Sequence, residues 1–170
     1  MSSRTDIEKF LDNMVDMIFN TKRTGREHGF RVCETDDSLR MSDICEGDKC
    51  SVALEKCPPR STTFLDMHTH PPRQSITATL PSPSDTLNAI KGRIRFMCIG
   101  SPIDDGVLRC YEVDSDTEDA RLFRKAMKDG KSSEAIKHLA RVYLDESSMM
   151  KQVGLWEDLL LTKGGDDASE

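Results

Sequence analysis

The feature that most constrains this chain is the segment of residues 64–85, FLDMHTHPPRQSITATLPSPSD, which joins a predicted strand to a predicted helix. Residues 61–68, which lead into this segment, are rich in Thr and Phe, as is typical of a strand. His68 and His70 are separated by one residue, so both imidazole rings leave the same face of that strand. Two metal-binding side chains are therefore expected to converge where the strand ends.

The helix in this segment is predicted to begin at SPSD, residues 82–85. Ser82 is a natural N-cap, Pro83 suits the first helical position because no N–H is needed there, and Asp85 falls at the third helical position. The strand end and the helix start then direct both histidines and Asp85 to one point. Two imidazoles and one carboxylate suit zinc, and three protein ligands leave a fourth tetrahedral position for water.

The HTHP and PSPSD segments, in this order, resemble the signature of the JAMM (MPN-plus) zinc metalloproteases, which include deubiquitinating isopeptidases. The resemblance implies that zinc (Zn2+) is held by His68, His70 and Asp85. It also implies that Ser82 helps to stabilise the oxyanion. A glutamate from an earlier strand is the general acid/base of the family, and Glu27 in TGREHGFRVC matches it, since it lies shortly before a glycine and an apolar strand.

This resemblance implies hydrolysis of an amide or isopeptide bond by a metal-activated water, without a covalent intermediate. Glu27 is expected to take the proton of the water and to pass it to the leaving amine, while Ser82 donates a hydrogen bond to the developing oxyanion. The implied substrate is a protein or peptide, and more specifically a ubiquitin-like protein conjugate.

Two alternatives come from the same residues. The D-x-H-x-H pattern of residues 66–70 also opens the metal site of amidohydrolase-like and PHP-type phosphoesterase barrels. Such barrels need ~200–250 residues with most strands after this pattern, and only 100 residues follow His70. The second alternative is a non-catalytic MPN-type scaffold or protein-interaction module without metal, against which the intact ligand residues argue. Metal analysis of the purified protein separates the scaffold from the enzyme.

Composition and charge limit the partners. The 170-residue chain has a net charge of −6 and no Lys- and Arg-rich run along a predicted helix face, which argues against a nucleic-acid partner. No stretch approaches the ~20 apolar residues of a membrane span, and acidic residues interrupt the N-terminal region where a signal peptide is apolar. The sequence therefore predicts no membrane partner and a cytoplasmic location.

Six cysteines are many for a reducing compartment: Cys33, Cys45, Cys50, Cys57, Cys98 and Cys110. Free buried thiols are the default expectation. A second zinc held by the three crowded cysteines between residues 44 and 58 is an alternative, although the spacing lacks a C-x2-C pair. Cys98 and Cys110 are cross-strand neighbours in one register, but a shift of one residue removes the contact, so no bond is predicted.

Patterning predicts an α/β fold. An apolar stripe at alternating steps of three and four residues predicts a helix over residues 5–20. A second short helix is predicted after Asp85, ending near Gly92. Strands are predicted over residues 27–33, 39–45, 51–54, 61–68, 93–100 and 107–113. The fold is thus expected to be a mixed central sheet sandwiched by helices, and the resemblance implies the cytidine-deaminase-like architecture of the JAMM family.

The chain is expected to divide into three parts. Residues 1–116 are predicted to form the metalloprotease core, with residues 71–81 as an exposed connection across the metal site. Residues 117–163 are predicted to be a helical C-terminal extension packed on the core, including a last helical segment from Met149 to Leu161. These helices are expected to cover the core, whereas an exposed face with Trp156 and the leucines of residues 159–161 would indicate a surface for an oligomer or a partner protein. The acidic residues 164–170 are predicted to be a disordered tail.

Overall fold

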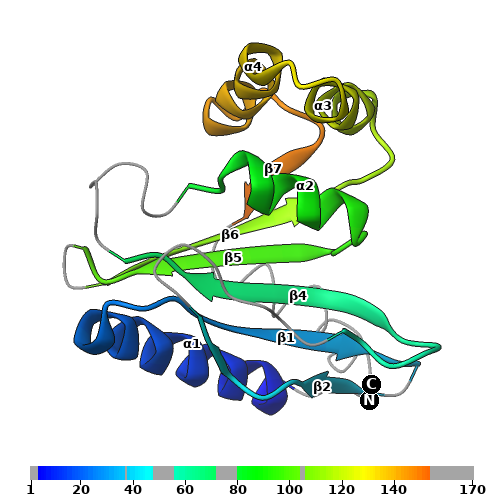
Figure 1. Ribbon diagram of the computed structural model, residues 1–170. Coiled ribbons are helices and arrows are strands. Elements are labelled where there is room, and N and C mark those ends of the chain that lie inside the picture. The colour runs from blue at the N-terminus through cyan, green and yellow to red at the C-terminus, as the bar shows by residue number, and fades with distance from the viewer. Residues whose placement is uncertain (1–3, 37, 48–55, 72–79, 104–105, 154–170) are drawn as a thin grey trace.

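Helices cover both faces of one mixed sheet (Figure 1). The computed structural model describes residues 4–36, 38–47, 56–71, 80–103 and 106–153. In chain order the elements are α1 (Arg4–Thr24), β1 (His28–Glu34), β2 (Leu39–Met41), β3 (Cys45–Glu46), β4 (Thr62–Thr69), α2 (Pro83–Lys91), β5 (Phe96–Ser101), β6 (Val107–Val113), α3 (Glu118–Lys128), α4 (Ser132–Tyr143) and β7 (Met150–Val153). The predicted α/β class with a mixed sheet is confirmed over these residues.

The strand order is β2-β1-β4-β5-β6-β7, and β3 pairs with the start of β1. Neighbouring strands run antiparallel, except that β4 and β5 are parallel. Helix α2 connects these two parallel strands, so β4, α2 and β5 form a βαβ unit. In such a unit the carboxyl end of the first strand and the N-terminus of the helix lie at the same end of the sheet, where ligands commonly bind.

Helix α1 covers one face of the sheet. Its predicted apolar stripe forms this contact, because Phe10, Met14 and Met17 are buried in one cluster with strand residues such as Phe30 and Met67. The helix lies close to β5, where residue 100 is a glycine. A Cβ atom at Gly100 would lie 2.8 Å from a side-chain carbon of Ile18, so a larger residue there would require the Ile18 side chain to move.

Helices α2, α3 and α4 lie on the opposite face (Figure 1). Ile90 of α2, Phe123 of α3 and Leu139 of α4 belong to one buried cluster with Met97 of β5 and Tyr111 of β6. The sheet therefore separates two apolar cores, and the helices after residue 117 are part of the second core. Burial on both faces explains why β5, FMCIGS, is a nearly continuous apolar run.

The end of the described chain differs from the prediction. Residues 150–153 form strand β7 and not part of a helix, with Met150 opposite Val113 and Val153 opposite Cys110. The prediction of a helix was wrong here because β6 has backbone groups that need partners, and pairing with β7 satisfies them. The predicted strand over 39–45 is likewise divided into β2 and β3. The predicted strand 51–54, residues 154–163 of the last helical segment and the tail 164–170 lie outside the described residues.

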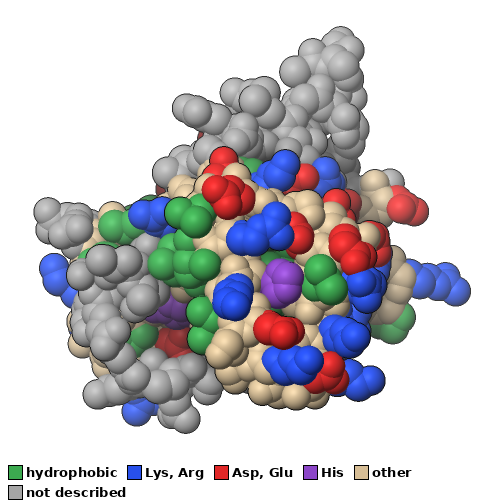
Figure 2. All heavy atoms as spheres, turned by 90° about the horizontal axis from the view of Figure 1, so that it is seen from above, with side chains coloured by type: hydrophobic (Ala, Val, Ile, Leu, Met, Phe, Trp, Pro, Cys, Tyr) green, Lys and Arg blue, Asp and Glu red, His purple; other side chains and the backbone are tan. Residues whose placement is uncertain are grey.

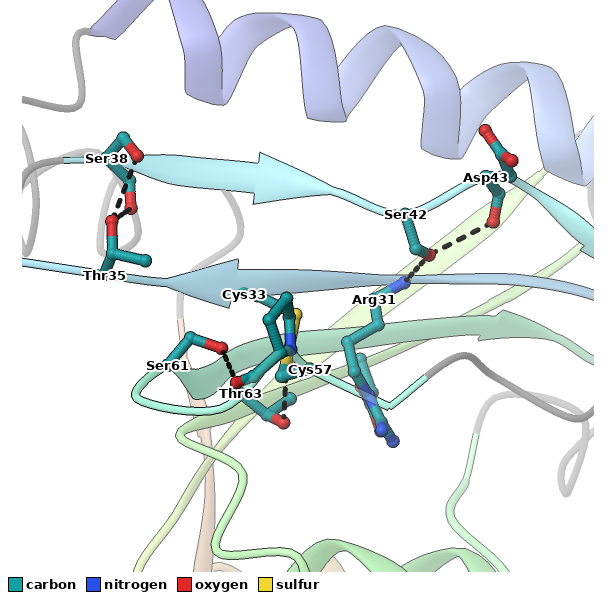
Figure 3. Close-up of a disulfide and its surroundings, with 11 residues drawn as sticks. Arg31, Cys33, Thr35, Ser38, Ser42, Asp43, Cys57, Ser61 and Thr63 are labelled. Carbon is teal, nitrogen blue, oxygen red and sulfur yellow. Dashed lines mark hydrogen bonds and ion pairs between the residues drawn. A yellow bond between two sulfur atoms is a disulfide. The ribbon is translucent and has the colours of Figure 1, made fainter.

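Four cysteines form two disulfides, so the expectation of free thiols was wrong for them. Cys98 and Cys110 are opposite each other in the register of β5 and β6 and are bonded. Cys33 of β1 is bonded to Cys57, and Figure 3 shows this bridge on the side of β1 away from α1. Because Cys57 is bonded to Cys33, it is not a thiolate ligand of a second zinc. The sequence does not show that the segment before β4, which contains Cys57, lies next to β1.

Candidate metal centre

Three side chains converge at the carboxyl end of β4. His68 is the second-last residue of β4, and His70 directly follows the strand. The N–H of His70 donates to the carbonyl of Gly100, which extends the pairing with β5. The two Nε2 atoms are 3.0 Å apart. Oδ2 of Asp85 lies 3.3 Å from Nε2 of His68 and 3.4 Å from Nε2 of His70. The three residues form a group that can hold a metal ion, as their spacing predicted.

These distances fit a tetrahedral ion. With metal–nitrogen and metal–oxygen distances near 2.0–2.1 Å, the ligand atoms of a tetrahedral zinc site lie about 3.3 Å from one another. The three measured separations of 3.0, 3.3 and 3.4 Å are close to that value. The donor set of two imidazoles and one carboxylate also suits zinc. The side chains are mostly shielded from solvent, with 11%, 17% and 22% of the His68, His70 and Asp85 side chains exposed.

Glu27 lies beside this group but at a greater distance. Its Oε1 atom is 3.7 Å from Nε2 of His70, and 6% of its side chain is exposed. The position follows from the antiparallel register of β1 and β4, in which Gly29 lies opposite His68 and the residue two positions earlier approaches His70. The sequence resemblance placed Glu27 at the site, and the structure brings it there. Glu27 is not among the three residues whose ligand atoms all lie within 4.8 Å of one another, so it lies next to the ligand group.

Ser82 and Asp85 hold each other at the start of α2. The N–H of Asp85 donates to Oγ of Ser82 at 3.0 Å, and the N–H of Ser82 donates to Oδ2 of Asp85 at 3.1 Å. This reciprocal capping box is the arrangement expected from SPSD, with Pro83 as the first helical residue. The Asp85 oxygen that accepts from Ser82 is the same atom that faces both imidazoles. The cap of the helix therefore orients the carboxylate toward the histidines.

Opposite charges change the titration of the group. Burial by itself favours neutral His68, but the charge and hydrogen bond of Asp85, with smaller contributions from Glu27 and Asp66, raise the pKa of His68 above its ordinary value. Burial likewise favours protonated Asp85. The facing His68 and His70 and the backbone of Ser82 nevertheless hold the pKa of Asp85 far below its ordinary value. Asp85 is therefore an anion at neutral pH, as a metal ligand must be.

A buried polar cluster supports the site from the α1 side. Nδ1 of His28 lies 3.1 Å from Oγ1 of Thr21 and 3.0 Å from the carbonyl of Arg26. The N–H of His28 donates to Oγ1 of Thr69 at 2.9 Å, and the Thr21 and Thr69 hydroxyls bond to each other. His28 thus faces α1 while its neighbour Glu27 faces the metal centre, because adjacent residues along a strand point to opposite sides.

Sequence reasoning missed an ion pair next to the site. Arg31 of β1 makes a two-pronged contact with Asp66 of β4, at 2.6 Å from Nε to Oδ1 and 2.8 Å from the guanidinium to Oδ2. The two residues are opposite each other in the register. Asp66 precedes His68 by two positions on the same strand, so the pair ties β1 to the strand that carries the histidines. The sequence shows Asp66 two positions before His68, but it does not identify the partner of Asp66, because Arg31 lies 35 residues away.

The outer face over α3 and α4 has a mixed charge. Figure 2 looks onto these helices and shows Lys and Arg side chains intermingled with Asp and Glu around a histidine. That face therefore presents both signs of charge and no single-signed patch among the described residues. No helix in the described ranges combines the length and apolarity that a membrane span requires.

Comparison of the chain with protein-family models, with curated proteins and with solved structures finds no match. The site is therefore defined by its own geometry, as a partly buried centre of two histidines and one carboxylate with an adjacent glutamate.

Proposed function

We propose that this protein is a zinc-dependent hydrolase of the JAMM type, which cleaves an amide or isopeptide bond with an activated water. The observation that carries this proposal is the close agreement of the His68, His70 and Asp85 separations with the edges of a zinc tetrahedron, with Glu27 beside them. The sheet with helices on both faces is compatible with the cytidine-deaminase-like architecture that the sequence resemblance implies.

The three ligand residues would hold the ion and would leave a fourth tetrahedral position for a reactant. When bound, zinc supplies a Lewis acid that polarises a carbonyl and acidifies water at neutral pH. The anionic Asp85 balances part of the charge. His68 and His70 would hold the ion as neutral imidazoles, so metal binding would compete with the proton that Asp85 favours on His68.

Glu27 is the proposed general acid/base. Its carboxylate projects from the start of β1 into a position 3.7 Å from His70 Nε2, within reach of a reactant at the open side of the centre. In this role it takes a proton from the attacking water and returns it to the nitrogen of the leaving amine. Its nearly complete burial keeps bulk water from exchanging that proton between the two steps.

Ser82 is the proposed oxyanion partner. Its Oγ accepts from the N–H of Asp85 with a lone pair, and a hydroxyl that accepts in this way can still donate its own hydrogen. The hydroxyl is only partly buried, next to the ligand carboxylate. It can therefore donate to an oxygen on which negative charge develops during attack.

The proposed substrate is a protein or peptide, with a ubiquitin-like protein conjugate as the more specific class. This part of the proposal rests on the resemblance of HTHP and PSPSD to the JAMM signature, and the cytoplasmic location stays a prediction. The alternative is an MPN-type scaffold, in which the group of His68, His70 and Asp85 would hold no metal ion.

The decisive experiment combines metal analysis with turnover. Wild-type protein is expected to bind about one zinc per chain, and His68→Ala is expected to lose it. Glu27→Gln should retain zinc but lose at least ~100-fold in hydrolysis of a fluorogenic panel of ubiquitin-like proteins joined to a lysine peptide. Glu46→Gln is the matched control, because Glu46 pairs with the same end of β1 but is exposed.

Two results would contradict the proposal. Wild-type protein without bound zinc favours the scaffold, and a Glu27→Gln variant with wild-type turnover removes Glu27 from the reaction.

A further inference from the structure

Tyr143, the last residue of α4, reaches Pro81, which lies just before α2, the helix that carries Asp85. Its hydroxyl donates a hydrogen bond to the carbonyl of Pro81 at 2.7 Å, across 62 residues of sequence. Pro81 is buried and directly precedes Ser82. A helix that the sequence assigned to a separate extension therefore contacts the backbone beside the proposed centre.

The Pro81 carbonyl and the Ser82 N–H belong to one peptide group, which is planar and rigid. Tyr143 bonds the oxygen of this group, and Oδ2 of Asp85 accepts from its N–H at 3.1 Å. The plane is thus held from both sides. Any rotation that breaks the first bond also turns the N–H away from Asp85. Hydrogen bonding to the carbonyl also polarises the same amide and strengthens its donation.

Tyr143 stays protonated in this position. Partial burial raises its pKa, and the negative charge of Asp85 raises it further. The hydroxyl is therefore a donor throughout the neutral range. Tyr143 makes its bond to Pro81 although 42% of the residue is exposed.

We propose that Tyr143 is a positioning residue of the metal centre: its hydroxyl fixes the Pro81–Ser82 peptide and, through it, the Asp85 carboxylate and the Ser82 hydroxyl. The proposal rests on the metal centre described under the proposed function, and it gives α4 a role in the site. The chain of contacts runs from α4 through one peptide to the oxygen that faces both imidazoles.

Tyr143→Phe tests this proposal, because it removes only the hydroxyl and keeps the ring. We expect its affinity for Zn²⁺, measured by competition with a chromophoric chelator, to be about tenfold weaker than that of wild type, since groups that orient a ligand have effects of this order. Visible absorption of the Co²⁺-loaded protein reports coordination geometry, and we expect it to change in the variant. The urea midpoint of the metal-free protein should change little.

Two neighbouring substitutions are the controls. Leu144→Ala changes an exposed side chain next to Tyr143, and Val142→Ala creates a cavity at a buried position of the same helix. Val142→Ala should lower the urea midpoint, whereas both controls should keep wild-type Zn²⁺ affinity and Co²⁺ absorption. Stability of α4 and positioning of Asp85 are then measured separately.

The outcomes are distinguishable. Wild-type Zn²⁺ affinity in Tyr143→Phe overturns the positioning role, as does an equal loss of affinity in Val142→Ala. Weaker affinity in Tyr143→Phe alone supports it, even if no hydrolysis is found, in which case only the proposed hydrolase activity fails. A wild-type protein that binds neither Zn²⁺ nor Co²⁺ overturns both the metal centre and the role of Tyr143.

Discussion

The Cys33–Cys57 disulfide leads to a quantitative prediction about stability. The bridge closes a loop with a sequence separation of 24 and anchors the chain before β4 to β1 (Figure 3). In the chain-entropy description, a closed loop of about this length restricts the unfolded chain by about 3.5 kcal/mol at 25 °C. The double variant Cys33→Ala/Cys57→Ala should therefore lose about this much free energy of unfolding.

The loss is measurable in two ways. With an m-value of about 2 kcal/mol/M for a chain of this size, the urea midpoint should fall by about 1.7 M. The thermal midpoint should fall by about 7–14 °C. Cys45→Ala is the matched control, since Cys45 is a free cysteine and its loss removes no bridge. Zinc affinity should be unchanged in the double variant, because neither cysteine belongs to the ligand group of His68, His70 and Asp85.

One result would refute this reasoning. If the double variant unfolds at the wild-type urea concentration, and native unreduced protein is alkylated at Cys33 and Cys57, the bridge does not stabilise the fold. Loss of zinc affinity together with stability would instead show that the bridge also positions the metal centre.

Two further predictions concern helix α2 and helix α3. Ser82→Ala should cost about 1 kcal/mol in urea unfolding through the lost N-cap and about 100-fold in turnover, whereas Ser82→Thr, which keeps a hydroxyl, should restore much of both. The Ser148 backbone N–H, followed by its hydroxyl and Arg141, lowers the pKa of Asp119 below its ordinary 3.8. A lowered carboxyl pKa contributes stability above the ordinary value that is lost as the pH falls through the lower one. Asp119→Asn should therefore be about 1–2 kcal/mol less stable than wild type at pH 7, and urea unfolding should show this gap shrinking below about pH 4; a constant gap contradicts the assignment.

The sequence predicted the parts of the site that depend on local geometry. Alternation along a strand placed His68 and His70 on one face, and the cap chemistry of SPSD placed Asp85 at the start of α2. Glu27 came from the family resemblance, because its approach to His70 depends on the pairing of β1 with β4. Tyr143 was not predicted at all, since it reaches Pro81 across 62 residues and leaves no local pattern.

The missed parts of the fold have the same cause. The Arg31–Asp66 pair, the return of Cys57 to β1 and the pairing of β7 with β6 all join segments that are distant in sequence. Apolar periodicity shows which residues are buried but not which strand lies next to which. Met150 is buried while the two residues after it are exposed, and so short a pattern fits a helix end as well as a strand.

The register of β1 against β4 decides whether the site exists. Because side chains alternate along a strand, a slip of one residue would turn Glu27 toward α1 and bring His28 to the metal centre. The buried bonds of His28 with Thr21 and Thr69 resist such a slip, since they form only when His28 faces α1. Their loss would leave polar groups buried without their present partners, which costs about 1–3 kcal/mol for each group. The polar cluster of His28, Thr21 and Thr69 therefore specifies the side on which Glu27, the proposed general base, faces the metal centre.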